Sequence, residues 1–216
     1  RRTRGRHRLQ CRDVARRQVR ELASEAARQT LENARVDRDN NAATDEKVAP
    51  EIAVLFAMGV ESAGFVTQLQ GARKRKSCGV KETLGLLDGR VISVVETGVG
   101  QAEAARATHT VIRQLQPAWV VSAGFAGSLA DDLQRGHILM ADTVTDGQAA
   151  ALSLGVKVGV AQLAEIPWLH VGPLLTVDHV VRTPGERQAL AARHRAVACD
   201  METWAIATAC RQATTR

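Results

Sequence analysis

In the body of the chain, short apolar runs alternate with longer amphipathic stretches. The runs at 51–57 and 118–122 are almost wholly apolar, which is typical of strands buried on both faces of a parallel sheet. Two further β-type runs, 78–86 and 91–96, flank the turn Asp88-Gly89 and predict a hairpin. We expect additional strands at 137–143, 173–177 and 196–199.

Helical patterns follow several of these strands. The stretch from Gln101 to Leu115 is amphipathic and is ended by Pro117, and further helices are expected at 184–194 and 201–211. Strands that alternate with helices predict an α/β fold with a largely parallel or mixed sheet. The length of 216 residues suits one domain, whose core must be built from Ala, Val, Leu and Ile because aromatic residues make up only 3%.

Residues 1–48 differ in composition from the rest. We expect them to form a basic helical or disordered leader and linker before a domain that covers 49–216. Through Lys47 the chain has 13 Lys and Arg against 8 Asp and Glu, which leaves 16 against 15 of the 29 and 23 in the whole chain. We interpret the leader as a solvated extension. Two alternatives stay open: an arm that binds RNA or a membrane surface, and a translated upstream segment with no role.

The sequence argues against several classes of function. The cysteines form no CxxC pair, and the histidines show no i,i+4 pairing with an intervening acid, so we expect neither a metal nor a cofactor. Because no apolar run approaches the roughly 20 residues that span a bilayer, we expect a cytoplasmic protein that does not act at membranes. Binding of nucleic acid is expected only through the basic leader, if at all.

Unusual residues follow four of the predicted strands. These junctions are Met58–Glu61, Thr97–Gly100, Ala123–Gly127 and Asp200–Glu202. Ligands bind at such junctions in open α/β sheets, so we expect the four to converge on one site. Each also has a simpler explanation, since Glu61 could only favour a helix dipole and the glycines could only serve turns or close packing. Glu202 is harder to explain in this way, because it opens an almost wholly apolar helix and a buried carboxylate needs partners.

Four blocks of sequence carry a resemblance to a known family. They read IAVLFAMGVE, VVETGVGQAEA, VVSAGFAGSL and ACDMETWAIA, at 52–61, 94–104, 120–129 and 198–207. In order and spacing they resemble the nucleoside phosphorylase superfamily, and most of all its methylthioadenosine/S-adenosylhomocysteine nucleosidase branch. The resemblance implies a three-layer α/β/α fold with a mixed, largely parallel central sheet, which would be C-terminally incomplete in this chain. It also implies a homodimer that acts on a small purine nucleoside in purine and methionine salvage.

The resemblance further implies roles for individual residues. Glu61 matches the carboxylate that activates water, and Glu202 matches the acid that holds the 2′- and 3′-hydroxyls of the ribose. Met58 belongs to the same motif as Glu61, and Met201 would pack against the sugar. The wall around the sugar and base would include Val99, Phe125, Ala126 and Gly127, and the purine would be flanked by Val180 and Val181.

These residue types suit the cleavage of an N-glycosidic bond. Such cleavage passes through an oxocarbenium-like sugar, so positive charge develops near the anomeric carbon. An ionised Glu202 fixed to the diol would stabilise that charge. Glu61 would take a proton from the attacking water, a contribution of roughly 10²–10⁴ in rate. The leaving purine also needs a proton or a hydrogen bond at N7.

The sequence departs from the family pattern in three places. The family supplies the leaving-group acid as an aspartate in a Ser-Asp pair on a strand after the Glu202 helix, and this sequence reaches Arg216 without one. We therefore expect the acid, one strand and a terminal helix to be absent, and the activity of this chain to be weak or nil. Val180 stands where an aromatic residue is usual and Phe125 where a small polar residue is usual. Our hypothesis is that Phe125 supplies the stacking surface instead.

Two other functions remain open. A phosphorylase would use phosphate in place of water, with an anion site made by the turn Gly98–Gly100 and by Arg73, Arg75 or Arg106. Glu61 favours water, because a carboxylate would repel bound phosphate. The third reading is a non-catalytic nucleoside-binding or truncated protein.

Overall fold

The computed structural model describes residues 49–215, apart from 78, 149 and 157–164. The predicted leader and linker lie outside the described residues, so the division of the chain at residue 48 stays a prediction. None of the described helices has the length and apolar character needed to cross a membrane.

The first of two five-stranded sheets has the strand order β2-β3-β4-β1-β5. Its strands are β1 (Ile52–Phe56), β2 (Gln70–Ser77), β3 (Val80–Leu87), β4 (Arg90–Glu96) and β5 (Trp119–Ser122). The central strand β1 pairs in parallel with β4 and β5, and β3 pairs antiparallel with β2 and β4. The carboxyl ends of β1, β4 and β5 therefore meet at one edge, where three of the predicted junctions lie.

The hairpin predicted around Asp88-Gly89 is confirmed. Strands β3 and β4 pair antiparallel with Leu87 opposite Arg90. Asp88 and Gly89 both have positive φ, at 50° and 78°. Two such residues in succession give the turn a twist that matches the twist of the flanking strands.

Strand β2 was not predicted from the sequence. Its eight residues read QGARKRKS and lack the apolar alternation that indicates a half-buried strand. It lies at the edge of the sheet, with only β3 as a neighbour. Charged side chains on an edge strand discourage pairing with a second molecule, so the polar sequence suits this position.

The second sheet has the strand order β6-β10-β9-β7-β8. Its strands are β6 (Gly127–Ser128), β7 (Ile138–Thr145), β8 (Leu152–Ser153), β9 (Leu169–Thr176) and β10 (Ala198–Asp200). Strands β7, β9 and β10 are parallel, and β6 and β8 pair antiparallel at the two edges. The predicted α/β class with mixed pairing is confirmed. Among the described strands four pairings are parallel and four antiparallel, divided between two sheets.

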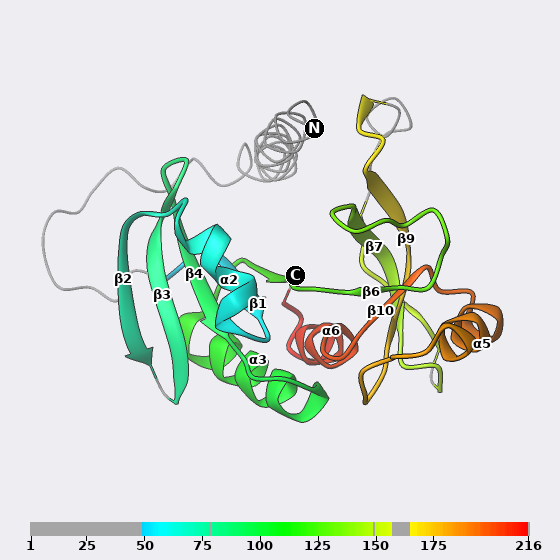
Figure 1. Cartoon of the computed structure of the whole chain (residues 1–216). Helices are drawn as coiled ribbons and strands as arrows, with labels where there is room; N and C mark the ends of the chain where they lie inside the picture. The colour runs from blue at the N-terminus through cyan, green and yellow to red at the C-terminus, as the bar shows by residue number, and fades with distance from the viewer. Residues whose placement is uncertain (1–48, 78, 149, 157–164, 216) are drawn as a thin grey trace, which may run out of the picture. The chain divides into compact units, whose positions relative to one another are not determined.

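Four described helices accompany the sheets. They are α2 (Gly59–Val66), α3 (Gln101–Leu115), α5 (Pro184–His194) and α6 (Thr203–Gln212). The bounds of α3 agree with the prediction, since Gly100 precedes its first turn and Gln116, in the left-handed region, follows its last. In Figure 1, α6 lies between the two sheets and beside α3.

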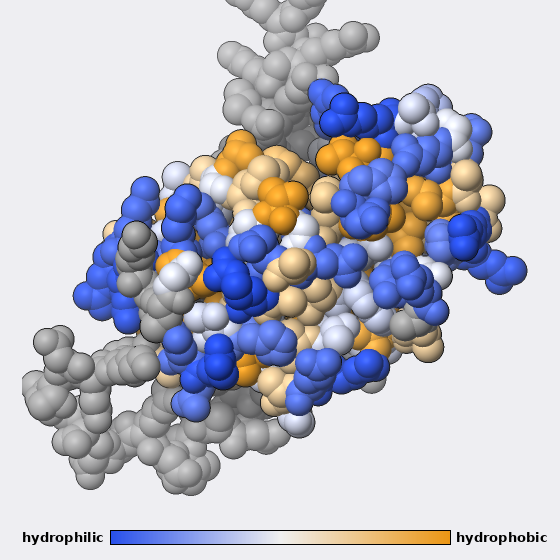
Figure 2. Space-filling model, turned by 90° about the horizontal axis from the view of Figure 1, so that it is seen from below, coloured by the Kyte–Doolittle hydropathy of each residue, from blue (hydrophilic) through white to orange (hydrophobic). Residues whose placement is uncertain are grey.

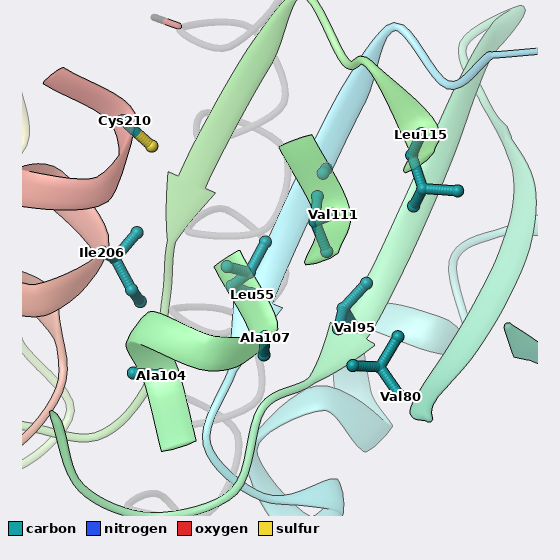
Figure 3. Close-up of a cluster of buried hydrophobic side chains, with 10 residues drawn as sticks. Leu55, Val80, Val95, Ala104, Ala107, Val111, Leu115, Ile206 and Cys210 are labelled. Atoms are coloured by element: carbon teal, nitrogen blue, oxygen red, sulfur yellow. The ribbon is translucent and has the colours of Figure 1, made fainter. Parts of the chain in front are cut away.

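The largest buried cluster joins α3 and α6 to the first sheet (Figure 3). Its members are small or branched aliphatic residues and one cysteine: Ala53, Leu55, Val80, Val95, Ala104, Ala107, Val111, Leu115, Ile206 and Cys210. On its other side α6 presents Trp204 and Ala207 to a second cluster, built around Val144 and Leu174. Because α6 packs into both clusters, the residues at its start hold a fixed position relative to both sheets.

The surface carries apolar areas between hydrophilic ones. On the face shown in Figure 2, orange apolar areas are separated by charged and polar side chains. The large hydrophobic residues with the most exposed side chains are Met58, Val60, Leu86, Val99, Val121, Phe125 and Val180. Several of them lie at the strand ends where the site was predicted.

A buried carboxylate in the first sheet allows a test of stability. Glu82 on β3 is 2% exposed, and its Oε1 accepts a hydrogen bond of 2.9 Å from Ser93 Oγ. Its Oε2 accepts no hydrogen bond from the described residues and lies 3.9 Å from Arg75 Nε. A buried ion pair is costly to desolvate, so an apolar residue of similar size often replaces one without loss.

We expect the double variant Glu82→Met/Ser93→Ala, which removes the carboxylate together with its buried hydroxyl partner, to leave the free energy of unfolding unchanged or to raise it. By contrast, Ser93→Ala removes the one hydrogen bond that the buried carboxylate accepts and should cost about 1–3 kcal/mol. Urea unfolding of both variants provides the measurement. If Glu82→Met/Ser93→Ala proved more destabilising than Ser93→Ala, this view of the Glu82 site would be wrong.

Candidate active site

Glu61 links the ends of β1 and β5. It lies in the first turn of α2, and its Oε2 accepts a 2.9 Å hydrogen bond from the backbone N–H of Met58. Its Oε1 accepts a 3.0 Å hydrogen bond from the backbone N–H of Phe125, in the loop that follows β5. A residue that only favoured the helix dipole would not need this second, long-range contact. The two bonds fix the orientation of the carboxylate.

Gly124 lies close to the carboxylate of Glu61. A Cβ atom at position 124 would lie 3.1 Å from Glu61 Oε1, tighter than an ordinary van der Waals contact. The absence of a side chain lets the loop after β5 come close enough for Phe125 to donate its N–H. The glycine in this junction therefore shapes the site, beyond any general role in packing.

Glu202 is held by a different junction. It is the N-cap residue of α6, and its Oε1 accepts a 2.7 Å hydrogen bond from the N–H of Gly100. Its Oε2 accepts a 3.2 Å hydrogen bond from the N–H of Met201. Gly98 and Gly100 have φ of 91° and 93°, a region that residues with a side chain rarely adopt, so the turn that presents this N–H depends on glycine.

The surroundings of Glu202 shift the pKa of its carboxyl group in opposite directions. Burial raises the pKa of Glu202 above its ordinary value of 4.5, and the hydrogen bond from Gly100 acts in the opposite direction. The negative charges of Asp200 and Glu61 raise the pKa of Glu202 further, while the N–H of Met201 lowers it. Glu61 contributes the smallest of these effects on the pKa of Glu202, and the convergence of the junctions after β1 and β10 stays a prediction.

Sequence reasoning missed two residues that position Glu202. Asp200 Oδ2 accepts a 2.9 Å hydrogen bond from the N–H of Thr203, and Asp200 Oδ1 accepts one of 2.6 Å from Thr176 Oγ1. The same Thr176 hydroxyl accepts the N–H of Trp204 at 2.9 Å. These contacts satisfy backbone N–H groups at the start of α6, as helix capping requires. The aspartate three residues before Thr203 was the available signal in the sequence.

A further contact joins the two sheets beside the site. Ser122, the last residue of β5, and Thr203, the first residue of α6, share a hydrogen bond of 2.8 Å between their hydroxyls. The carbonyl of Asp200 accepts the N–H of Val177 at 2.9 Å, so the loop after β9 starts beside the Glu202 segment. The junctions from both sheets are therefore tied to the start of α6.

The predicted wall residues fall into two groups. Exposed apolar side chains belong to Met58 (40%), Val99 (50%), Phe125 (69%) and Val180 (60%), each just after a strand. Such unburied apolar surface beside fixed polar groups is typical of a ligand site. The remaining positions differ: Val181 packs against the buried cluster of the second sheet, Met201 is partly buried, and Ala126 and Gly127 are exposed backbone positions near or in β6.

The leaving-group acid expected from the family pattern is not among the described residues. After α6 these are Ala213, Thr214 and Thr215, and none of them is acidic. The expectation of weak activity therefore stays a prediction. Within the same described residues, no group of three or more His, Cys, Asp or Glu side chains could hold a metal ion.

Comparisons with known proteins identify the family and the fold of this chain. The model of the phosphorylase superfamily matches residues 51–168. Curated 5′-methylthioadenosine/S-adenosylhomocysteine nucleosidases of Shewanella sp. (strain W3-18-1) and Shewanella baltica (strain OS195) are 26% identical over 185 residues, which cover 75% of this chain and 80% and 78% of theirs. The solved S. pneumoniae nucleosidase with the transition-state inhibitor MT-ImmA has a TM-score of 0.68 at 22% identity, over 76% of this chain and 80% of that one. Because the family model matches more than half of its residues, the chain belongs to the phosphorylase superfamily.

Proposed function

We propose that this protein hydrolyses the N-glycosidic bond of a purine nucleoside such as methylthioadenosine or S-adenosylhomocysteine. The observation that carries the proposal is the pair Glu61 and Glu202, each of which is fixed by two backbone N–H groups at the junctions that follow the strands. The names of the curated relatives support the same reaction and substrate class.

In the proposed reaction Glu202 binds the sugar. Each of its oxygens accepts one backbone N–H, and each keeps a second lone pair for a hydroxyl of the ribose. Its ionised form stabilises the positive charge that develops on the sugar ring. Met201, the neighbouring residue, supplies an apolar surface for the sugar. Val99, Phe125 and Val180 supply the exposed apolar surface on which the ribose and purine rest.

Glu61 activates the nucleophile in this proposal. Its two hydrogen bonds leave lone pairs that can accept a proton from a water molecule. Met58 and Phe125, whose N–H groups hold the carboxylate, also carry exposed apolar side chains. Met58 and Phe125, which orient the Glu61 carboxylate, thereby also shield the attacking water on one side.

Phosphorolysis is the alternative, and the described contacts favour it less. The N–H of Gly100, which an anion site in the glycine turn would need, is occupied by Glu202. Arg106 pairs with Glu103, and Arg75 faces the buried Glu82. Arg73 and Arg75 lie on β2, which β3 and β4 separate from β1. The arginines that could supply charge are therefore committed elsewhere or distant from the junctions.

The nature of the nucleophile is tested by the products. We expect the protein to release adenine and free methylthioribose from methylthioadenosine in phosphate-free buffer, with no increase in rate when phosphate is added. Chromatography of the sugar product distinguishes the free sugar from its 1-phosphate. Release that requires phosphate and yields the 1-phosphate would move the assignment to a phosphorylase. The expected homodimer, cytoplasmic location and independence of cofactors stay predictions.

A further inference from the structure

A histidine between two carboxylates lies beside the expected purine wall. His179 follows β9, in the loop that leads to α5. Its Nδ1 is 2.6 Å from Asp178 Oδ1, and its Nε2 is 2.6 Å from Glu186 Oε1. Ionised carboxylates only accept hydrogen bonds, so both ring nitrogens must donate. Only the protonated imidazolium can do this.

Glu186, in the first turn of α5, also binds the part of the loop that follows His179. Its Oε2 accepts a 3.2 Å hydrogen bond from the N–H of Arg182. Its own N–H donates to the Oγ1 of Thr183, the N-cap residue of α5, at 3.3 Å. The imidazolium of His179, near the start of the loop, binds the other oxygen of Glu186. We call the set Asp178, His179 and Glu186 the histidine bridge.

The histidine bridge encloses the two valines of the expected purine wall. Val181 packs against the buried cluster that contains Leu175 and Cys199, and Val180 remains 60% exposed. The loop also starts beside the Glu202 segment, through the hydrogen bond from Val177 N–H to the Asp200 carbonyl. Val180 therefore lies in the sequence between two fixed residues, His179 and Val181, and keeps its side chain exposed.

We propose that protonated His179 is a positioning residue, which bridges the loop to α5 and thereby holds Val180 against the purine. This inference rests on the proposed function, because it takes the purine as the group that Val180 contacts. It adds a dependence of substrate affinity on the protonation of a side chain that does not touch the substrate.

The charges set the pH range in which the bridge is complete. Among the described residues, two charged groups face His179: Asp178 from its own loop and Glu186 from α5. Hydrogen bonds to Asp178 and then to Glu186 raise the pKa of His179 above its ordinary value of 6.5. The hydrogen bond from His179 lowers the pKa of each carboxyl below its ordinary value, 3.8 for Asp178 and 4.5 for Glu186. All three groups are therefore charged at a pH above the pKa values of Asp178 and Glu186 and below the raised pKa of His179. The histidine bridge is lost as the pH rises through the pKa of His179.

The test uses the full chain and adenine as the probe. Adenine lacks the sugar, so its binding does not require the chemistry of Glu61 and Glu202. We expect the dissociation constant of adenine, measured by calorimetry, to rise by about three- to tenfold between about pH 6 and about pH 9, the range expected for one misplaced apolar contact. His179→Gln should bind adenine with the weaker affinity at every pH in this range. His109→Gln, which alters an exposed histidine on α3, is the matched control and should behave like the unchanged protein.

The titration of His179 itself links the effect to this residue. Proton NMR of its ring should give a midpoint that coincides with the change in adenine affinity, a readout that does not depend on the variant folding. Equal pH dependence in His179→Gln and in the unchanged protein would overturn the inference, as would a flat affinity while His179 titrates. Nucleoside cleavage with pH-independent adenine affinity would leave the proposed function in place. Adenine binding that depends on His179 without cleavage would leave the bridge in place, and absence of adenine binding at every pH would overturn both.

Discussion

Replacing Glu202 by glutamine is expected to lower kcat/KM for the release of adenine from methylthioadenosine by about 10²–10³-fold. Glutamine has nearly the same shape, but it carries no charge to stabilise the sugar cation. The carboxylate accepts hydrogen bonds from the backbone N–H groups of Gly100 and Met201. In the glutamine variant the side-chain NH2 faces one of these two N–H groups, which then has no acceptor. Initial rates over a range of substrate concentrations provide the measurement. Retention of the full kcat/KM would remove Glu202 from the proposed mechanism.

The raised pKa of Glu202 adds a pH signature and a control. Because the ionised form is the active one, kcat/KM should fall as the pH drops through the raised pKa, and this acid limb should lie above the ordinary value of 4.5. Ionisation of a carboxyl with a raised pKa costs stability as the pH rises through that value. The free energy of unfolding of Glu202→Gln should therefore lack this fall as the pH rises through the raised pKa of Glu202. Glu103→Gln, an exposed carboxylate in the first turn of α3, is the matched control for activity.

Replacing Glu61 by glutamine is expected to lower kcat by about 10²–10⁴-fold, with a smaller effect on KM. The amide cannot accept a proton from water, whereas its oxygen can still accept the N–H of Phe125 or Met58. Since Glu202 and the apolar wall bind the substrate in the proposal, binding should largely persist. Steady-state kinetics separate the two parameters, and calorimetry with adenine checks that the site is still formed.

A variant of the neighbouring Glu96 distinguishes proton transfer by Glu61 from an effect of its charge on the dipole of α2. Glu96, at the end of β4, also lies at the start of α2, where its Oε1 would be 3.1 Å from a Cβ atom at Gly59. Glu96→Gln removes the same charge near the same helix end and should leave kcat unchanged. If both variants lost activity equally, the helix-dipole explanation of Glu61 would be preferred over the catalytic one.

The elements predicted well are those with strong local signals. The turn residues Asp88 and Gly89 fix a two-residue hairpin through their own backbone preferences. The helix Gln101–Leu115 has an amphipathic period together with a glycine before it and a proline after it. Strand β2 has no such signal, because its pairing with β3 does not require an apolar face. It was therefore missed, and nothing in its sequence indicates a strand.

In the site, too, residues with a local sequence signal were predicted, whereas contacts between residues far apart in the sequence were not. Glu61 and Glu202 were proposed from a family resemblance and from their positions after strands. Their partners could not be predicted, because Phe125 lies 64 residues from Glu61 and Gly100 lies 102 residues from Glu202. Such contacts depend on the packing of both sheets around α6. The bridge at His179 was missed for a related reason: Glu186 comes within reach only when α5 starts at Pro184 and folds back on the loop.

The most direct test of the central claim is a time course of adenine release from methylthioadenosine in phosphate-free buffer. The unchanged protein and the double variant Glu61→Gln/Glu202→Gln are compared at equal concentration, with circular dichroism to confirm that both are folded. We predict that the unchanged protein releases adenine weakly, because the expected leaving-group acid is not among the described residues, but above the uncatalysed background, and that release by the double variant stays at background. Equal rates for the two proteins, whether at background or above it, would contradict the claim that these two carboxylates form the active site of a nucleosidase.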